Sequence, residues 1–209
     1  QTSFKRRIKS SLAVGLSFLK TAYENSNFIF DQIEIANNYS NDIVLQHKRT
    51  TSTEIIKAID IESNELIDFT ATMHSSKKSI ATLLRDRPIA YIIKKNNFGF
   101  IEKLNDVGVN YVEFERDTMI YSGSYKVVEY NNNFKVYEKM KMQKVATSIE
   151  YNKNTFSRGD ILISMNQKRS NLIAELLEPE APNSYVSFGI IKTSLDKQLP
   201  IYRIKNFNN

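Results

Sequence analysis

The first part of the chain carries apolar residues at the spacing of an amphipathic helix. Between residues 3 and 24 they recur at intervals of three or four positions, at Phe4, Ile8, Leu12, Leu16, Leu19 and Tyr23. This spacing places them along one face of a helix, and Ser3 is a suitable N-cap. A second helical stretch is expected over residues 28–36, before a polar run at 37–42. The pattern therefore predicts an N-terminal helical part, residues 1–36, that ends at this polar break.

After residue 43 the pattern changes to short runs of β-branched and aromatic residues separated by polar turns, which is typical of strands. The expected strands are 54–60, 66–73, 89–93, 111–114, 124–130, 134–140, 146–151, 161–165 and 200–204. The run Asn131-Asn132-Asn133 is a candidate hairpin turn, because Asn tolerates left-handed backbone conformations. A helix is expected at 170–177, where Pro179 ends it. Residues 43–209 are thus predicted to form a β-rich domain.

Residues 88–114 have the most regular pattern of this domain. An apolar strand at 89–93 is followed by helical spacing over 96–106, by Gly108 as a C-cap, and by a new strand near Tyr111. A strand, a helix and a strand in this order form a βαβ unit, whose two strands run parallel. The predicted fold class is therefore α+β, with a mixed β-sheet that contains this βαβ unit and an amphipathic helix before it.

Composition and charge narrow the function classes. The chain has 209 residues, of which 41% are hydrophobic and 25% charged, as in ordinary globular domains. No apolar run approaches the roughly 20 residues of a membrane span. The net charge is +6, but the basic clusters are scattered and interleaved with carboxylates. We interpret them as solvated surface, and nucleic-acid binding is not favoured, because such binding needs a gathered basic face.

The residues available for chemistry are few. The chain has no cysteine, which excludes thiol nucleophiles and Cys-ligated zinc, and it has two histidines, His47 and His74. Both are followed closely by cationic residues, and neither belongs to a His-x-x-Glu pair. No Gly-x-Ser-x-Gly elbow and no glycine-rich phosphate loop is present. The acidic pair Glu113 and Glu115 is interpreted as solvated side chains. The sequence therefore predicts neither an active site nor a bound cofactor in this chain.

Several segments resemble a known family. Residues 3–8, 18–20 and 23–25 are similar to the final helix of the zinc carboxypeptidase fold in bacterial members of the carboxypeptidase A-like superfamily. Residues 158–167, 172–182 and 200–204 are similar to the region that follows the peptidase domain in those proteins. In that region a Gly, a strand that ends in Gln and a Leu-Leu-Glu-Pro-Glu run recur, and this chain has Gly159, Gln167 and residues 176–180 in these places. Residues 88–114 also fit this region.

The resemblance implies a domain organisation and a set of partners. Residues 1–36 would be the terminal helices of a carboxypeptidase-like domain, and 43–209 a non-catalytic accessory domain that packs on it and shapes access to its cleft. The zinc ligands and the catalytic glutamate would lie upstream of Gln1, so zinc is expected only in that upstream domain and no catalytic or metal-binding residue is assigned here. A bacterial origin, secreted or periplasmic, and a homo-oligomer through the 3–24 helix are further expectations.

Six residues are predicted to have an interdomain or structural role: Gly159, Gln167, Glu175, Glu178, Glu180 and Arg203. The alternative function is an autonomous binding module for an anionic polymer, either nucleic acid or cell-surface glycan, because the net charge is positive.

Overall fold

A computed structural model describes residues 3–37, 42–95, 99, 101–133 and 136–206. The chain divides into two compact units, residues 1–40 and 41–209. The first unit contains the helices α1, Phe4–Glu24, and α2, Ser26–Asn37. The hydroxyl of Ser3 accepts a hydrogen bond from the Arg6 amide at 3.3 Å and caps α1. None of the side chains of α1 is buried. Most of the polar break predicted at 37–42 lies outside the described residues.

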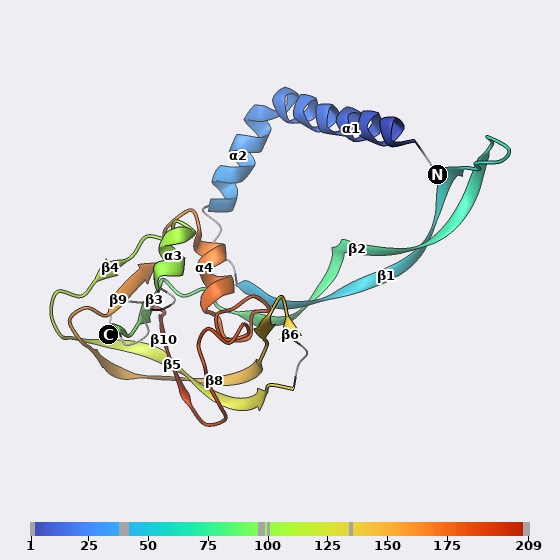
Figure 1. The fold of residues 1–209 in the computed structure, drawn as a ribbon. Helices are drawn as coiled ribbons and strands as arrows, with labels where there is room; N and C mark the ends of the chain where they lie inside the picture. Colours follow the sequence, from blue (N-terminus) through green and yellow to red (C-terminus); the bar gives the residue numbers. More distant parts are fainter. Residues whose placement is uncertain (1–2, 38–41, 96–98, 100, 134–135, 207–209) are drawn as a thin grey trace. The chain divides into compact units, whose positions relative to one another are not determined.

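The second unit is built on a six-stranded sheet with the order β4-β9-β3-β10-β5-β8 (Figure 1). Its strands are β3 (Ala90–Ile93), β4 (Val112–Glu113), β5 (Thr118–Asn131), β8 (Lys144–Phe156), β9 (Ile161–Ser164) and β10 (Gln198–Ile204). Two helices accompany the sheet, α3 (Ile101–Asp106) and α4 (Ser170–Leu177). Helices and strands together support the α+β class. Every pairing between the described strands is antiparallel, so the predicted mixed sheet is wrong.

The predicted βαβ unit is not confirmed, because its two strands do not pair. Strands β3 and β4 each pair antiparallel with β9, which lies between them. The reason is a third apolar run, β9, that comes about 50 residues later in the chain and takes the position between them. Gly108 follows α3 with a φ of 68°, and its amide donates to the Asn105 carbonyl at 2.8 Å. Part of the predicted helix, residues 96–98 and 100, lies outside the described residues.

The core lies on both faces of the sheet. In β3, Tyr91 and Ile93 belong to a large apolar cluster that includes Ile173 and Leu177 of α4. Ala90 and Ile92 point to the opposite face, where they join a smaller cluster. A strand that is buried on both faces reads as a continuous apolar run, which explains the sequence Ala-Tyr-Ile-Ile.

A long hairpin joins this core. It consists of β1, Ile43–Ile59, and β2, Leu66–Arg85, which pair only with each other among the described strands (Figure 1). Sequence analysis predicts only the distal parts of these strands, because the polar residues at 46–53 and 74–79 read as loop. At the base, Ile43 and Leu45 are buried in the large cluster.

A second, short hairpin follows β5 and precedes β8 in the sequence. It is formed by β6, Val136–Tyr137, and β7, Met140–Lys141, and its turn residues Glu138 and Lys139 have φ values of 47° and 68°. The hairpin turn predicted at 131–133 is wrong, because β5 pairs with β8 and Asn131 lies opposite Lys144. The predicted strand at 134–140 begins at residues outside the described ones.

Candidate functional site

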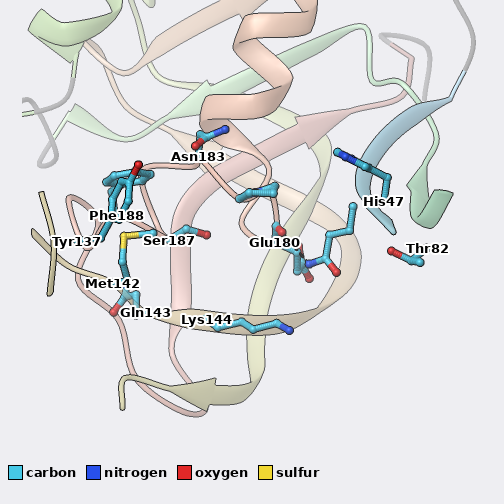
Figure 2. A pocket seen from close by; sticks show the side chains of 12 residues that line it. His47, Thr82, Tyr137, Met142, Gln143, Lys144, Glu180, Asn183, Ser187 and Phe188 are labelled. Carbon is cyan, nitrogen blue, oxygen red and sulfur yellow. Dashed lines mark hydrogen bonds between the residues drawn. The ribbon is translucent and has the colours of Figure 1, made fainter. Parts of the chain in front are cut away.

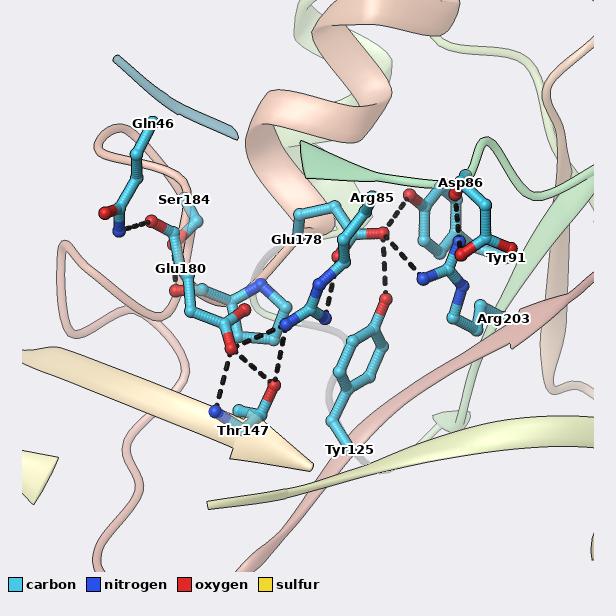
Figure 3. A network of polar contacts seen from close by, with 11 residues as sticks. Gln46, Arg85, Asp86, Tyr91, Tyr125, Thr147, Glu178, Glu180, Ser184 and Arg203 are labelled. Atoms are coloured by element: carbon cyan, nitrogen blue, oxygen red, sulfur yellow. Dashed lines mark hydrogen bonds and ion pairs between the residues drawn. The ribbon is translucent and has the colours of Figure 1, made fainter. Parts of the chain in front are cut away.

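The most unusual feature of the second unit is a buried network of charged side chains around Glu178, which follows α4 directly (Figure 3). One carboxylate oxygen of Glu178 accepts hydrogen bonds from the hydroxyls of Tyr91 at 2.6 Å and Tyr125 at 2.9 Å. The other oxygen accepts from Nη1 of Arg85 at 3.2 Å. Glu178 itself has no exposed surface. A carboxylate so placed is fully surrounded by donors, as a buried charge requires.

Glu180 extends the network towards β8. Its Oε1 accepts hydrogen bonds from Nη2 of Arg85 at 2.7 Å, from the Thr147 amide at 2.8 Å and from the Thr147 hydroxyl at 2.6 Å. Its backbone carbonyl accepts from Nε2 of Gln46 on β1 at 2.9 Å. The loop after α4 is therefore tied to three strands, β1, β2 and β8. The second carboxylate oxygen, Oε2, is buried and has no hydrogen-bond partner among the described residues.

Arg203 of β10 completes the network from the other side. It is fully buried, its Nη1 lies 4.0 Å from Oε1 of Glu178, and its Nη2 donates to the carbonyl of Asp86. Its Nη2 also lies 3.4 Å from the Asp86 carboxylate. With two carboxylates, Glu178 and Glu180, and two guanidinium groups, the interior part of the network is neutral in sum.

The environment of the network raises the pKa values of its tyrosines and of Arg85. Burial raises the pKa of Tyr91 and of Tyr125 well above the ordinary tyrosine value, and the negative charge of Glu178 adds to the effect. Burial alone would lower the pKa of Arg85, but Glu180 and Glu178 outweigh it, so the pKa is raised. The tyrosines therefore act as donors and the arginine as a permanent cation. This arrangement ties strands together, because its donors and acceptors come from β2, β3, β5 and the loop after α4.

The other predicted site residues lie elsewhere. Gly159 forms the turn before β9 with a φ of 88°, and Gln167 holds both backbone groups of Asn110 through its side-chain amide. Glu175 accepts two hydrogen bonds from Asn183, at 3.0 and 2.9 Å. The structure thus brings together Glu178, Glu180 and Arg203, whereas Gly159, Gln167 and Glu175 make local contacts.

Sequence reasoning missed the other members of the network, which include Arg85, Tyr91, Tyr125 and Thr147. Tyr91 and Tyr125 stand in apolar strand runs and read as ordinary core residues. Arg85 sits in a Leu-Leu-Arg-Asp-Arg-Pro stretch and reads as surface charge. The only available signal was the excess of carboxylates after α4, which need cationic partners if they are buried.

A groove of about 790 Å³ lies beside Glu180 (Figure 2). Tyr137 and Phe188 form one end, with ring centroids 6.4 Å apart, and His47 and Thr82 of the long hairpin form the other. Gln143 is buried in its floor and donates to the carbonyls of Val186 and Ile191. The groove combines apolar side chains, such as Met142 and Phe188, with polar ones, such as His47 and Lys144, as ligand-binding grooves commonly do.

The described residues contain no group of three or more His, Asp or Glu side chains close enough to hold a metal ion. His47 lines the groove, whereas His74 lies opposite Thr51 in the long hairpin. Among the described helices, none combines the length and the apolar character that a membrane crossing requires.

Three known proteins that are similar to this chain are all fungal proteins named carboxypeptidase 2. Carboxypeptidase 2 of Trichophyton equinum is 28% identical over 211 residues, which cover 97% of this chain and 38% of that protein. Carboxypeptidase 2 of Trichophyton rubrum has the same identity and coverage, and that of Trichophyton tonsurans is 27% identical over 206 residues. This chain is similar to one part of a fungal carboxypeptidase. No protein-family model and no solved structure matches it.

The chain spans little more than a third of the length of these relatives. Partial coverage of this kind is consistent with the C-terminal region of a carboxypeptidase. The relatives are fungal, so they give no support to the expected bacterial origin. Secretion stays a prediction.

Proposed function

We propose that residues 43–209 form a non-catalytic accessory domain of a metallocarboxypeptidase-like protein, which packs on the peptidase domain and influences access to its cleft. The observation that carries the proposal is the coverage: nearly the whole chain matches, yet it matches only 38% of each of the three relatives named above. In this proposal the peptidase domain supplies the zinc site, and residues 1–36 belong to that domain.

The geometry supports a structural role for the predicted motif. The carboxylates of Glu178 and Glu180 are engaged by Arg85, two tyrosines and Thr147, so the Leu-Leu-Glu-Pro-Glu run serves to join strands. Glycosidases and proteases that work with carboxylates keep at least one such group open to substrate or water. In this accessory domain the corresponding groups are enclosed.

The test uses the complete reading frame that contains this chain, the same protein without residues 43–209, and this chain alone. We expect this chain alone to cleave no peptide with a free C-terminal carboxylate and to hold no stoichiometric zinc after dialysis. We expect the complete protein to be active and removal of 43–209 to lower its thermal midpoint. One zinc per isolated chain, lost in His47→Ala but kept in His74→Ala, would overturn the proposal, as would a midpoint that is indifferent to the deletion.

Binding of an anionic polymer stays a prediction from the net charge of +6. Retention on a polyanion column distinguishes the two functions. Polyanion binding releases counterions and falls steeply as salt rises, whereas a domain that packs through apolar surface elutes at low salt.

A further inference from the structure

The distal part of the long hairpin, residues 50–59 of β1 with 66–75 of β2, is here called the arm. Its register is unbroken from the pair Thr50 and Ser75 to the pair Ile59 and Leu66. Among the described strands, neither β1 nor β2 pairs with any other, so the arm is a two-stranded ribbon. An isolated two-stranded hairpin is only marginally stable in water and usually needs a further layer.

The two faces of the arm differ in chemistry. Residues directly opposite each other share a face, and successive residues alternate between faces. One face has the opposed apolar pairs Ile56 with Phe69 and Ala58 with Ile67, and it continues on β2 with Ala71 and Met73, which lie opposite Glu54 and Ser52. The other face has Ile59 opposite Leu66 and Ile55 opposite Thr70, and the ion pair between Lys57 and Asp68 separates these two pairs. The first set of six residues, Ile56, Ala58, Ile67, Phe69, Ala71 and Met73, is called the apolar face.

The apolar face is accessible. Phe69 is 53% exposed, Ile67 is 42% exposed and Ile56 is 40% exposed. Exposed apolar side chains of this kind on a sheet with free edges favour aggregation unless another surface covers them.

The base of the arm is firmly held. Arg85, at the end of β2, is fixed by Glu178 and Glu180, and Gln46 of β1 donates to the Glu180 carbonyl. Leu45 is buried in the core. The buried charge network therefore secures the root of a ribbon whose distal part has no layer of its own. This explains why so many charged groups are placed at that point of the core.

We propose that the apolar face of the arm is the surface by which this domain docks on the remaining part of the longer protein. The inference rests on the proposed function and names the contact that carries it. The three relatives have more than half of their length outside the matched segment, so under the proposed function this domain has a covalently linked partner. A tethered partner acts at an effective concentration of about millimolar, far above that of a second copy in solution. The linked part is therefore the occupant that the face meets first.

The experiment compares two double variants in the complete protein and in this chain alone. Ile56→Thr with Phe69→Thr alters the apolar face, and Ile59→Thr with Leu66→Thr alters an opposed pair on the other face. Threonine keeps the strand propensity in both cases. The readouts are amide hydrogen exchange over the arm and the thermal midpoint.

In the complete protein, we expect the arm to exchange more slowly than in this chain alone. The Ile56→Thr/Phe69→Thr variant should lose this protection and lower the midpoint of the complete protein, whereas Ile59→Thr/Leu66→Thr should keep both. Equal protection in the two proteins, or equal effects of the two variants, would overturn the inference. A dimer of the isolated chain that only Ile56→Thr/Phe69→Thr dissociates would also overturn it in favour of self-association.

Failure of the docking surface can be distinguished from failure of the proposed function. If deletion of 43–209 leaves the midpoint of the complete protein unchanged, the accessory role itself fails. If that deletion lowers the midpoint but the apolar-face variant does not, the accessory role stands and only the docking surface is wrong.

Discussion

At the scale of single residues, Glu178 dominates, because it is the buried charge on which two arginines and two tyrosines converge. Removing one partner of a buried ion pair leaves the other charge uncompensated, which costs about 3–5 kcal/mol. We expect Glu178→Gln to lower the free energy of unfolding by this amount in urea denaturation. Glu175→Gln is the matched control, since Glu175 lies in the last turns of α4 just before Glu178, is only partly buried, and its Asn183 contacts tolerate an amide acceptor.

If Glu178→Gln does not fold, Tyr125→Phe still tests the network. It removes one hydroxyl donor, so we expect a loss of about 1 kcal/mol. Equal stability of Glu178→Gln and Glu175→Gln would contradict this account of the network.

The raised pKa values of three tyrosines predict how the free energy of unfolding depends on pH. Burial raises the pKa of Tyr185 to about 12, with Asp106 adding to the shift, and burial also raises the pKa of Tyr91 and Tyr125. The folded state therefore binds these protons more tightly than the unfolded state, whose tyrosines titrate near a pKa of about 10. Their stabilisation is complete below pH 10 and falls as pH rises towards the folded pKa values.

We expect the free energy of unfolding to fall above pH 10, by up to about 1.4 kcal/mol per pH unit for each such tyrosine. Urea denaturation at intervals from neutral pH to pH 11.5 measures the slope. Tyr185→Phe should reduce that slope, whereas Tyr23→Phe, in exposed α1, should leave it unchanged. The same slope in both variants would rule out this origin.

Gly108 shows how a single backbone position ends an element. At a φ of 68° a side chain is strained, and an added Cβ would lie 3.1 Å from Nε of Arg169. We expect Gly108→Val to cost about 1 kcal/mol or more in chemical denaturation. Gly15→Val is the control, because Gly15 lies inside α1 with no neighbouring atom within 4 Å. A Gly108→Val protein as stable as the parent would show that this cap contributes nothing.

At the scale of elements, the spacing of apolar residues predicts those helices that depend only on residues close together in the sequence. The helix over 170–177 appears with the expected bounds, because its apolar residues and Pro179 define it within a dozen positions. The sheet order could not be predicted this way. Whether β3 pairs with β4 or with β9 depends on an apolar run that lies far along the chain, and each run alone has the same pattern.

In the candidate site, too, some residues could be predicted from the local sequence and others could not. Glu178, Glu180 and Arg203 could be named from a sequence motif, but their partners could not, because Arg85 lies more than 90 residues before Glu178. A tyrosine in an apolar strand also gives no sign of whether its hydroxyl meets a carboxylate or solvent. Polar networks between distant strands are visible only after the strands are placed.

The turn of the short β6–β7 hairpin has a strained backbone, and a double substitution can test this. Glu138 and Lys139 both have positive φ, which two-residue hairpin turns require and which Asn-Gly adopts at low cost. We expect Glu138→Asn with Lys139→Gly to raise the free energy of unfolding by about 1 kcal/mol or more. Asn132→Gly with Asn133→Gly is the control and should give no gain, because neither residue has a positive φ. Equal effects on urea denaturation would contradict the turn assignment.

At the scale of the whole molecule, the two compact units differ in what they bury. Both apolar core clusters consist of residues 43–204, whereas α1 buries none of its side chains. The apolar residues of α1 are largely exposed, with Phe4 at 71% and Leu12 at 60%. A helix with such a stripe gains most of its stability in proteins from a surface that packs on it.

Deletion of residues 1–36 tests this organisation. Because the core clusters lie wholly within the second unit, we expect the remaining chain to keep its thermal midpoint, and its solubility to rise as the exposed apolar residues of α1 and α2 are removed. Sedimentation of both chains tests the predicted homo-oligomer through the 3–24 helix, which should be present in the intact chain and absent after deletion. A remaining chain that unfolds would assign the helices to the core of 43–209, and an oligomer that survives the deletion would place the self-association surface elsewhere.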